Sequence, residues 1–320
     1  MKSSIKAEVP FFKRTIVVFL CAAICCAFWG SSMPCIKGGY ALFSIGSDNI
    51  PARILFAGVR FIIAGILTIL SGSFGAKKFL IPIDKSSWIR VFVLCTFQTV
   101  LQYFFLYGGL AHTLGVKSAI IGATNVFASI LVASLIFRQE KLTLRKIIGC
   151  LIGFCGVVIL NLFGTGGILQ TDLSFKFIGE GFLFLSAIAH GVAAALLKKF
   201  SKNNNPVMLS GWQFFFGGVI MATAGYSAGG RMIVADGMFF AAVSLLIYMA
   251  LISTVAYSLW GILLKYNHVS KVVIFGFLNP VFGVIFSAVF LNEANRTGSV
   301  AIISLLLVCI GIIVVSKGKN

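Results

Sequence analysis

The chain has 320 residues, of which 59% are hydrophobic and 11% are charged. An ordinary soluble domain has about a quarter of its residues charged, so this composition excludes one. The formal net charge is +18. In a soluble protein such an excess would suggest nucleic acid as a partner, but here the basic residues stand in short clusters between apolar stretches, so no nucleic-acid partner is expected.

The apolar stretches are long enough to be membrane-spanning helices. Each such helix needs about 20 apolar residues, so ten would use about 200 and leave about 120 for connections and ends. A sizeable soluble domain therefore has no room. The ten predicted helices are Thr15–Ile36, Ile54–Phe74, Trp88–Leu110, Val116–Phe137, Ile147–Gly167, Phe177–Leu197, Val207–Tyr226, Met238–Leu264, Val272–Leu291 and Val300–Ser316.

Other interpretations of these stretches do not fit. An outer-membrane barrel would show alternating apolar and polar residues in segments of about ten, which are absent. Lys13 and Arg14 precede the first apolar run, as in a signal peptide, but no small-x-small cleavage site leads into a hydrophilic domain, so we expect a retained helix. The eight cysteines lie in or at the ends of apolar segments and are interpreted as small hydrophobic residues. No metal and no cofactor is predicted.

The basic residues fall mainly on one side of the predicted membrane. With the N-terminus in the cytoplasm, 19 of the 26 lysines and arginines lie on the cytoplasmic side, six lie on the other, and Arg60 lies within a helix. The positive-inside rule therefore places both termini in the cytoplasm. The bias recurs in both halves of the chain, so no single loop decides the orientation.

The sequence contains an internal repeat. Four pairs of residues share one offset of 154: Tyr103 and Tyr257, Lys117 and Lys271, Gly122 and Gly276, and Asn125 and Asn279. Two earlier pairs follow in the same order: Trp29 and His190, and Arg60 and Gln213. Each unit has five helices, an odd number, so the second enters the membrane from the opposite side. We predict two inverted five-helix repeats, residues 15–163 and 177–316, which is the symmetry of alternating access to a central site.

Several short motifs occur in the order typical of one family. They are Trp29-Gly30-Ser31-Ser32, Arg60-Phe61, Asn279-Pro280-Val281, and Glu140 and Glu293 with glycines downstream. From Thr15 to Ser316 the chain thereby resembles the drug/metabolite transporter superfamily, EamA type. The resemblance implies a ten-helix inner-membrane carrier of small organic solutes, commonly amino acids or related metabolites and often exported, with helices 1 to 4 and 6 to 9 around a central cavity.

The chain departs from that pattern at two positions. Val126 stands where the second half has Pro280, so a symmetric helix break is not expected. His190 stands where an aromatic residue is more usual, which would tune the choice of substrate. His190 is the only ionisable side chain midway along its helix, and either binds substrate, carries a proton or is hydrogen-bonded between helices.

Arg60 is the first candidate for a substrate-binding residue. It lies about 10 Å inside the second helix, and a charge at that depth is expensive enough to suggest function. Functionally it would attract a carboxylate or phosphate. The alternatives are that it extends to the interface or caps carbonyl groups of a neighbouring helix.

Further polar and aromatic candidates lie on other helices. Gln98 and Gln102 share one helix face, and Asn125 and Asn279 lie near mid-depth; their amides suit a zwitterionic solute, or alternatively join helices. An aromatic wall is predicted from four residues: Trp29, Tyr103, Tyr257 and Trp260. Glu140 and Glu293 are expected to pair with nearby bases or to fix a loop. The small residues Gly149, Gly153 and Gly156 are expected to allow close helix approach or dimerisation.

Classes other than a carrier are less well supported. The eight acids are isolated from one another, and no HExxH, phosphate loop or Ser/His/Asp cluster is present, so an enzyme is not expected. No charge ring or filter sequence suggests a channel. No Asp or Glu lies deep in a helix, so uniport, exchange and a proton-linked cycle through His190 stay open.

We therefore expect an all-α, multi-pass protein of a bacterial cell membrane, in contact with lipid. The expected function is secondary transport of small organic metabolites, with export of amino acids or related metabolites as the first hypothesis. Import or exchange of a scavenged nucleotide-like or methyl-donor metabolite is the second, because alternating access is reversible and gradients set direction.

Overall fold

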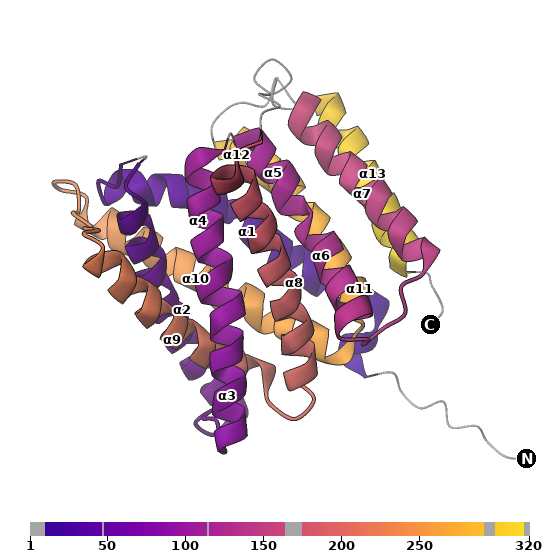
Figure 1. Cartoon of the computed structure of the whole chain (residues 1–320), viewed down its shortest axis with the longest axis horizontal. Coiled ribbons are helices and arrows are strands. Elements are labelled where there is room, and N and C mark those ends of the chain that lie inside the picture. Colours follow the sequence, from indigo (N-terminus) through magenta and orange to yellow (C-terminus); the bar gives the residue numbers. More distant parts are fainter. Residues whose placement is uncertain (1–9, 47, 114, 164–174, 291–297, 317–320) are drawn as a thin grey trace, which may run out of the picture.

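The structure is a computed structural model that describes residues 10–46, 48–113, 115–163, 175–290 and 298–316. Within these residues the protein is all-helical and contains no strand (Figure 1). Eight helices there are long and apolar enough to cross a membrane, and Val269–Gly283 and Ile302–Ser316 are shorter apolar helices. The prediction of an all-α membrane protein is confirmed.

The described helices follow the ten predicted segments in order. The first half comprises η1 (Phe11–Lys13), α1 (Thr15–Leu42), α2 (Ile50–Ala76), α3 (Lys85–Leu94), η2 (Cys95–Leu101), α4 (Gln102–His112), α5 (Gly115–Ala123), α6 (Asn125–Leu131), η3 (Val132–Ile136) and α7 (Leu144–Phe163). The second comprises η5 (Phe177–Gly181), α8 (Phe182–Phe200), α9 (Pro206–Ser227), α10 (Phe239–Tyr266), α11 (Val269–Val273), η6 (Ile274–Phe277), α12 (Leu278–Phe290) and α13 (Gly298–Ser316). The predicted ends at Gly167 and Leu291 lie outside the described residues.

Local sequence explains where several helices begin. Asn49 accepts a hydrogen bond from the Ala52 backbone at the start of α2, and Asn205 accepts one from Val207 at the start of α9. A proline follows each of these asparagines within the first helical turn, where its missing N–H costs nothing. The repeat-equivalent helices α2 and α9 therefore start with the same chemistry.

The fourth and ninth helices are both interrupted, which corrects the expectation of asymmetry. Helix α5 ends at Ala123 and α6 starts at Asn125, although the first half lacks a proline there. The hydroxyl of Thr124 donates to the Ile121 carbonyl at 2.6 Å, so a local side-chain bond competes with the helical pattern. In the second half the 3-10 turn η6 interrupts the corresponding helix before Pro280.

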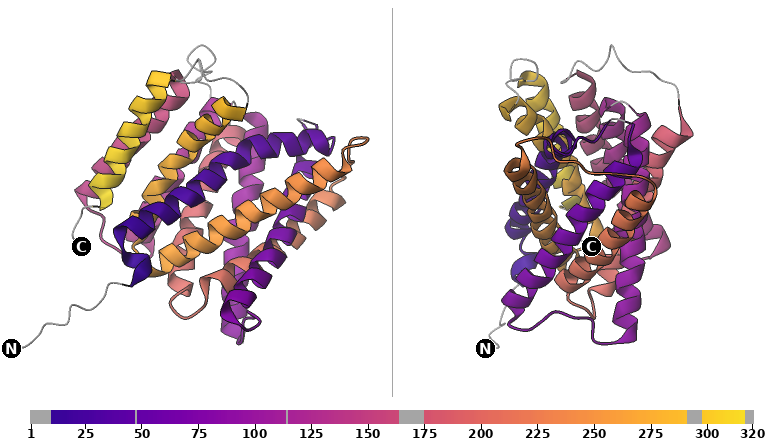
Figure 2. Two further views of the ribbon diagram at one scale, coloured as in Figure 1. Left: turned by 180° about the vertical axis from the view of Figure 1, so that it is seen from behind. Right: turned by 90° about the vertical axis from the view of Figure 1, so that its left-hand side faces the viewer.

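The helices pack with pseudo-two-fold symmetry. Helix α2 lies along α9 and α7 lies along α13, so each pair joins equivalent helices of the two halves. Helix α1 packs on α10 and α12, and α8 packs in the equivalent way on α4 and α6. Figures 1 and 2 show the α7–α13 pair at one edge of the molecule, with α2 and α9 toward the other.

Glycines allow the closest of these approaches. A Cβ added at Gly58 of α2 would lie 2.3 Å from the Ala222 backbone nitrogen of α9. On α7, a Cβ at Gly149 would lie 2.9 Å from the Gly311 carbonyl oxygen of α13, and one at Gly156 would lie 2.8 Å from the Ser304 carbonyl oxygen. The α7 glycines therefore serve a contact within the chain, and α13 already covers the face that could have served dimerisation.

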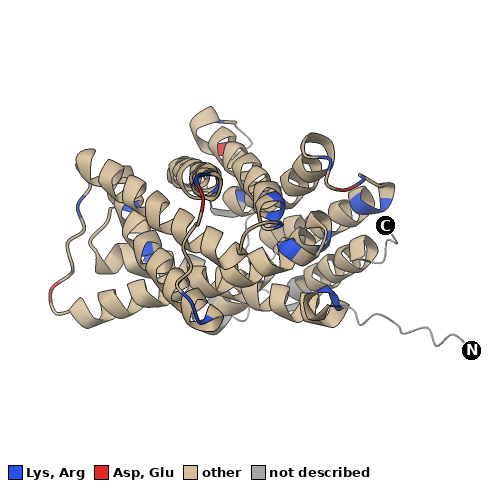
Figure 3. Ribbon diagram, turned by 90° about the horizontal axis from the view of Figure 1, so that it is seen from below, with Lys and Arg blue, Asp and Glu red and all other residues tan. Residues whose placement is uncertain are grey.

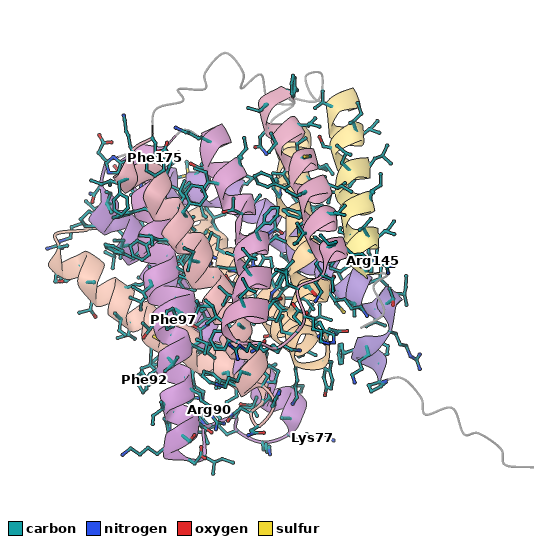
Figure 4. All side chains as sticks on the ribbon, turned by 45° about the vertical axis from the view of Figure 1, so that its right-hand side comes forward. Lys77, Arg90, Phe92, Phe97, Arg145 and Phe175 are labelled. Atoms are coloured by element: carbon teal, nitrogen blue, oxygen red, sulfur yellow. The ribbon has the colours of Figure 1, made fainter. Side chains whose placement is uncertain are left out.

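Both ends of the described chain lie on the same face of the bundle, which we call the inner face (Figures 1 and 2). Figure 3 views the molecule from that end and shows lysines and arginines at helix ends and in connections. Lys77 and Arg90 lie at this end in Figure 4, whereas Phe175 lies at the opposite one. This arrangement fits an even number of crossings with both termini on the predicted cytoplasmic side.

Candidate functional site

Arg60 is buried at the centre of the bundle. It is 3% exposed, and its Nη2 atom donates to Ser253 Oγ on α10 at 3.0 Å. Its guanidinium lies 5.0 Å from the ring centre of Phe61. The Nε and Nη1 atoms are buried without a hydrogen-bond partner, and the ion pairs among the described residues do not include Arg60. A cation held this way is preorganised for an anionic group, which the described residues do not supply.

The same arrangement recurs around Gln213, the repeat equivalent of Arg60. Thr99 Oγ1 donates to Gln213 Oε1 at 2.5 Å, and Thr99 precedes Ser253 by the repeat offset of 154 residues. Gln213 is fully buried, and its Nε2 atom has no partner. Arg60 and Gln213 thus occupy equivalent positions in the two halves, and only Arg60 carries a charge.

Aromatic rings mark the centre of this symmetry. Phe61 and Phe214 stack with ring centres 5.2 Å apart. The hydroxyls of Tyr103 and Tyr257, which are also 154 residues apart, lie 2.9 Å from each other. Each pair joins equivalent residues of the two halves, so the pseudo-two-fold axis passes between the two members of each pair. Two of the predicted site residues, Tyr103 and Tyr257, thus meet directly.

Trp29 extends the aromatic surface from α1. Its ring centre lies 5.2 Å from Tyr257 and 4.9 Å from Trp260, in edge-to-face geometry. The indole Nε1 atoms of Trp29 and Trp260 are buried without partners. Buried indole N–H groups usually find an acceptor, so these two donors are available to a bound solute.

Gln98 and Gln102 lie on an irregular part of the third helix. The π-helical segment η2 ends directly before Gln102 and contains Gln98, and such segments are frequent at functional sites. Both side chains are buried, and both Oε1 atoms lack partners. They add two buried acceptors on the helix that also carries Tyr103. We call the group the central polar cluster, defined as Arg60, Gln98, Gln102, Tyr103, Gln213, Ser253 and Tyr257.

The remaining predicted residues lie outside the direct contacts of this cluster. Ser186 Oγ donates to the Gln102 carbonyl at 2.9 Å, and His190 follows one turn later on the same face of α8. His190 has no hydrogen bond or ion pair within the described part of the chain. Asn125 and Asn279 are half-buried on the fourth and ninth helices, and Asn279 Oδ1 lacks a partner.

A second buried cluster lies near the inner face. Glu140 accepts hydrogen bonds from the Ser270 backbone at 3.0 Å and from the Ser270 hydroxyl at 2.8 Å, and it pairs with Lys146 at 3.2 Å. Its carboxylate also lies 3.6 Å from His268 Nδ1. The prediction that Glu140 pairs with nearby bases is confirmed. We call Glu140, Lys146 and Ser270 the inner tie; its counterpart Glu293 lies outside the described residues.

An ion pair on the opposite side provides an outer tie between the two halves. Lys117 on α5 pairs with Glu180 at 2.7 Å, at the start of the sixth helix. On the inner side, the repeat-equivalent Lys271 donates to the Lys13 carbonyl at 3.5 Å, at the start of the first helix. Equivalent lysines therefore join equivalent helix starts on opposite sides of the bundle.

A surface groove lies at the inner face, away from the central polar cluster. It has a volume of about 780 Å³ and is lined by residues 134, 135 and 138–142. Its carboxylate, Glu140, is already saturated by protein donors. We therefore place the candidate site at the unpartnered central groups rather than in this groove.

Three buried polar residues in or near the central polar cluster were not predicted from the sequence as site residues. Gln213 was aligned with Arg60 but was not proposed for binding, although that alignment was the available signal. Ser253 is a small hydroxyl residue within an apolar run, and Tyr107 is 1% exposed with an unpartnered hydroxyl. Only their placement in three dimensions distinguishes these two from packing residues.

Known proteins resemble the chain along most of its length. The EamA-like transporter family matches residues 16–162 and 177–317. The uncharacterized transporter YvbV of Bacillus subtilis is 24% identical, over 83% of this chain and 81% of the relative. A WAT1-related chloroplastic protein of Arabidopsis thaliana is 23% identical, over 92% of this chain and 68% of the relative.

A solved structure shares the fold. It is a crystal structure of a protein with 15% sequence identity and a TM-score of 0.73, over 93% of this chain and 95% of the other. At that identity the likeness concerns the fold alone. The transporter names among the relatives point to a transporter rather than an enzyme.

Proposed function

The chain belongs to the EamA-like transporter family, and from this premise we propose that it carries a small organic acid across a membrane by alternating access around the central polar cluster. The observation that carries the proposal is the state of Arg60: buried, bonded to Ser253 alone, and with two nitrogens unpartnered. A carboxylate would accept from those nitrogens and neutralise the charge.

The symmetry supports alternating access. The hydroxyls of Tyr103 and Tyr257 meet across the two halves, and Arg60 of the first half donates to Ser253 of the second. The outer tie and the Lys271 contact join the halves on opposite sides of this centre. Rocking of one half against the other would break one set of contacts while the other persists, which exposes the centre to one side at a time.

The surroundings suit amino acids and related metabolites. Arg60 supplies a site for a carboxylate, and the amide oxygens of Gln98 and Gln102 supply acceptors for an ammonium group. The edge-to-face rings of Trp29, Tyr257 and Trp260 supply an apolar and cation-binding surface. We propose export from the cytoplasm of a bacterial cell as the working direction.

Coupling is proposed to be exchange or a proton-linked cycle that uses His190. Among the described acids, Glu180 is paired with Lys117 and Glu140 with Lys146, so neither is available at mid-depth. His190 lies on the helix face that meets Gln102 and is free of hydrogen bonds within the described residues. If a pH gradient changes neither wild-type transport nor that of His190→Gln, the proton-linked form is excluded.

Counterflow in proteoliposomes tests the proposed function. The assay measures uptake of labelled amino acids, supplied as a panel of neutral and acidic members, into vesicles preloaded with the unlabelled compound. We expect uptake of at least one panel member, and its loss in Arg60→Gln. Arg145→Gln, which removes an exposed arginine at the inner end of α7, is the matched control. Equal uptake by Arg60→Gln and Arg145→Gln would move the site away from Arg60.

A further inference from the structure

A second arginine lies on the same face of α2 as Arg60. Arg53 precedes it by seven residues, which is two helical turns, so the two positions share a face and lie about 10 Å apart along the axis. Arg53 is half-buried, with its guanidinium 4.9 Å from the ring centre of Tyr40 on α1. Its Nε atom is buried without a hydrogen-bond partner. Two guanidiniums with unpartnered nitrogens therefore follow one another outward along α2.

Two tyrosines lie near both arginines. Tyr107 on α4 is 1% exposed, and its hydroxyl has no partner. The side chains of Tyr40 and Tyr107 each lie within electrostatic range of both Arg53 and Arg60. Helices α1, α2 and α4 thus direct two guanidiniums and two hydroxyls into one region. Hydrogen-bond donors dominate this region.

No carboxylate of the described chain neutralises either arginine. The ion pairs among the described residues belong to Glu180 and Glu140. Asp48 precedes Arg53 by five residues, but it is exposed and forms no ion pair with it. Two like charges on one helix face repel each other, and each also carries the cost of its burial. A ligand with a single negative charge would compensate only one of them.

Arg53 lies over the Tyr40 ring, and its buried Nε atom donates to no group of the described chain. A guanidinium that lies over an aromatic ring is held by its face, and its N–H edge remains free for bidentate bonding to a carboxylate. Arg60 is held in a similar way over Phe61 and by Ser253. Both arginines have long side chains mounted about 10 Å apart, so their ends can converge on the two acidic groups of one small molecule.

We propose that Arg53, Tyr40 and Tyr107 form a second anion subsite on the outer side of Arg60, and that the transported solute is a small diacid: a dicarboxylic acid or an acidic amino acid. Arg60 binds one carboxylate and Arg53 binds the other. The proposal rests on the proposed function, because it takes Arg60 as the central subsite. It assigns to Arg53 the selection of diacids over their monoamides.

Ligand-dependent thermal unfolding of the purified full-length chain tests the assignment. The probes are matched pairs that differ in one charge: L-glutamate with L-glutamine, and succinate with succinamate, at constant ionic strength. We expect the diacid of at least one pair to reach half-maximal stabilisation at a concentration tenfold or more below that of its monoamide. In Arg53→Gln this ratio should fall to about one, because the diacid loses the partner of its second carboxylate. Arg145→Gln should behave as wild type.

The variants separate failure of the subsite from failure of the transport site. Arg60→Gln should lose stabilisation by both members of the pair. Arg53→Lys keeps the charge but loses the bidentate edge, so the ratio of monoamide to diacid concentrations should be intermediate. This variant replaces Arg53→Gln if the latter does not fold. A wild-type ratio near one, or an unchanged ratio in Arg53→Gln, would overturn the second subsite alone. Binding that does not depend on Arg60 would overturn the proposed central site as well.

Discussion

The inner tie and the central polar cluster handle buried charge in opposite ways. The Glu140 carboxylate accepts two hydrogen bonds from Ser270 and pairs with Lys146, so protein groups satisfy it. Arg60 has one bond, to Ser253, and two buried nitrogens without partners. A satisfied buried charge holds two segments of the chain together, whereas an unsatisfied one leaves free energy for a ligand to recover. The comparison therefore separates a charge that holds the protein together from one that we propose to bind solute.

The largest effect is expected when the inner tie is broken. Glu140→Gln keeps the size of the side chain but leaves the Lys146 ammonium, whose side chain is 8% exposed, without its counter-charge. Removing one partner of a buried pair costs about 3 kcal/mol. We expect the midpoint of thermal unfolding of the purified protein to fall clearly below that of wild type.

The outer tie supplies the control for this change. Glu180→Gln removes the acid of an ion pair whose glutamate side chain is 5% exposed but whose lysine side chain is 22% exposed, so solvent reaches the lysine that is left and screens its charge. The expected cost is about 1 kcal/mol or less. A larger loss for Glu180→Gln than for Glu140→Gln would contradict the assignment of the inner tie as the structural charge.

Removing Arg60 should have the opposite consequence for stability. Arg60→Met replaces an uncompensated cation by an apolar side chain of similar length, which removes a desolvation cost and loses one bond to Ser253. We expect the free energy of unfolding to stay equal or rise by about 1 kcal/mol, while counterflow activity is lost. Thermal unfolding and counterflow on the same preparation measure both. Destabilisation as large as that of Glu140→Gln would make Arg60 a structural charge.

Much of the fold follows from the sequence because its signals are local. Apolar runs between charged clusters located the ten helices, and the offset of 154 residues predicted that Tyr103 and Tyr257 are equivalent positions. The break before Asn125 was not predicted, because it depends on the Thr124 hydroxyl bond rather than on a proline. Helix interruptions of this kind have only a weak sequence signal.

The candidate site was less predictable because its contacts are long-range. Arg60 was singled out, since a charge inside an apolar run is conspicuous in any sequence. Its partner Ser253 is 193 residues away, and Glu140 meets Ser270 across 130 residues. Arg53 is one of the six basic residues that the topology places on the non-cytoplasmic side, and only the structure shows that it is half-buried against Tyr40. Pairings over such distances come from packing, which periodicity does not encode.

The central polar cluster also contains a satisfied pair, the hydroxyls of Tyr103 and Tyr257. Tyr103→Phe or Tyr257→Phe should each cost about 1 kcal/mol, because one hydroxyl then stays buried without its partner. The double substitution should cost less than the sum of the single ones, since no hydroxyl is left unpaired. Thermal unfolding of the four proteins gives the coupling free energy. Additive costs would show that the two hydroxyls do not depend on each other.

The smallest expected effect concerns pH at the edge of the inner tie. Burial lowers the pKa of His268 from its ordinary value; nearby Glu140 raises it, and Lys198, Lys146 and Lys271 lower it further. The unfolded chain therefore binds this proton more readily than the folded one, so stability falls as pH drops through about 6.5, the unfolded value. The ring is 40% exposed, which limits the loss to less than about 1 kcal/mol. Thermal unfolding between pH 7.5 and 5.5 should show a shallower decline in His268→Gln than in wild type, and a steeper one would mean that protonated His268 strengthens the tie through Glu140.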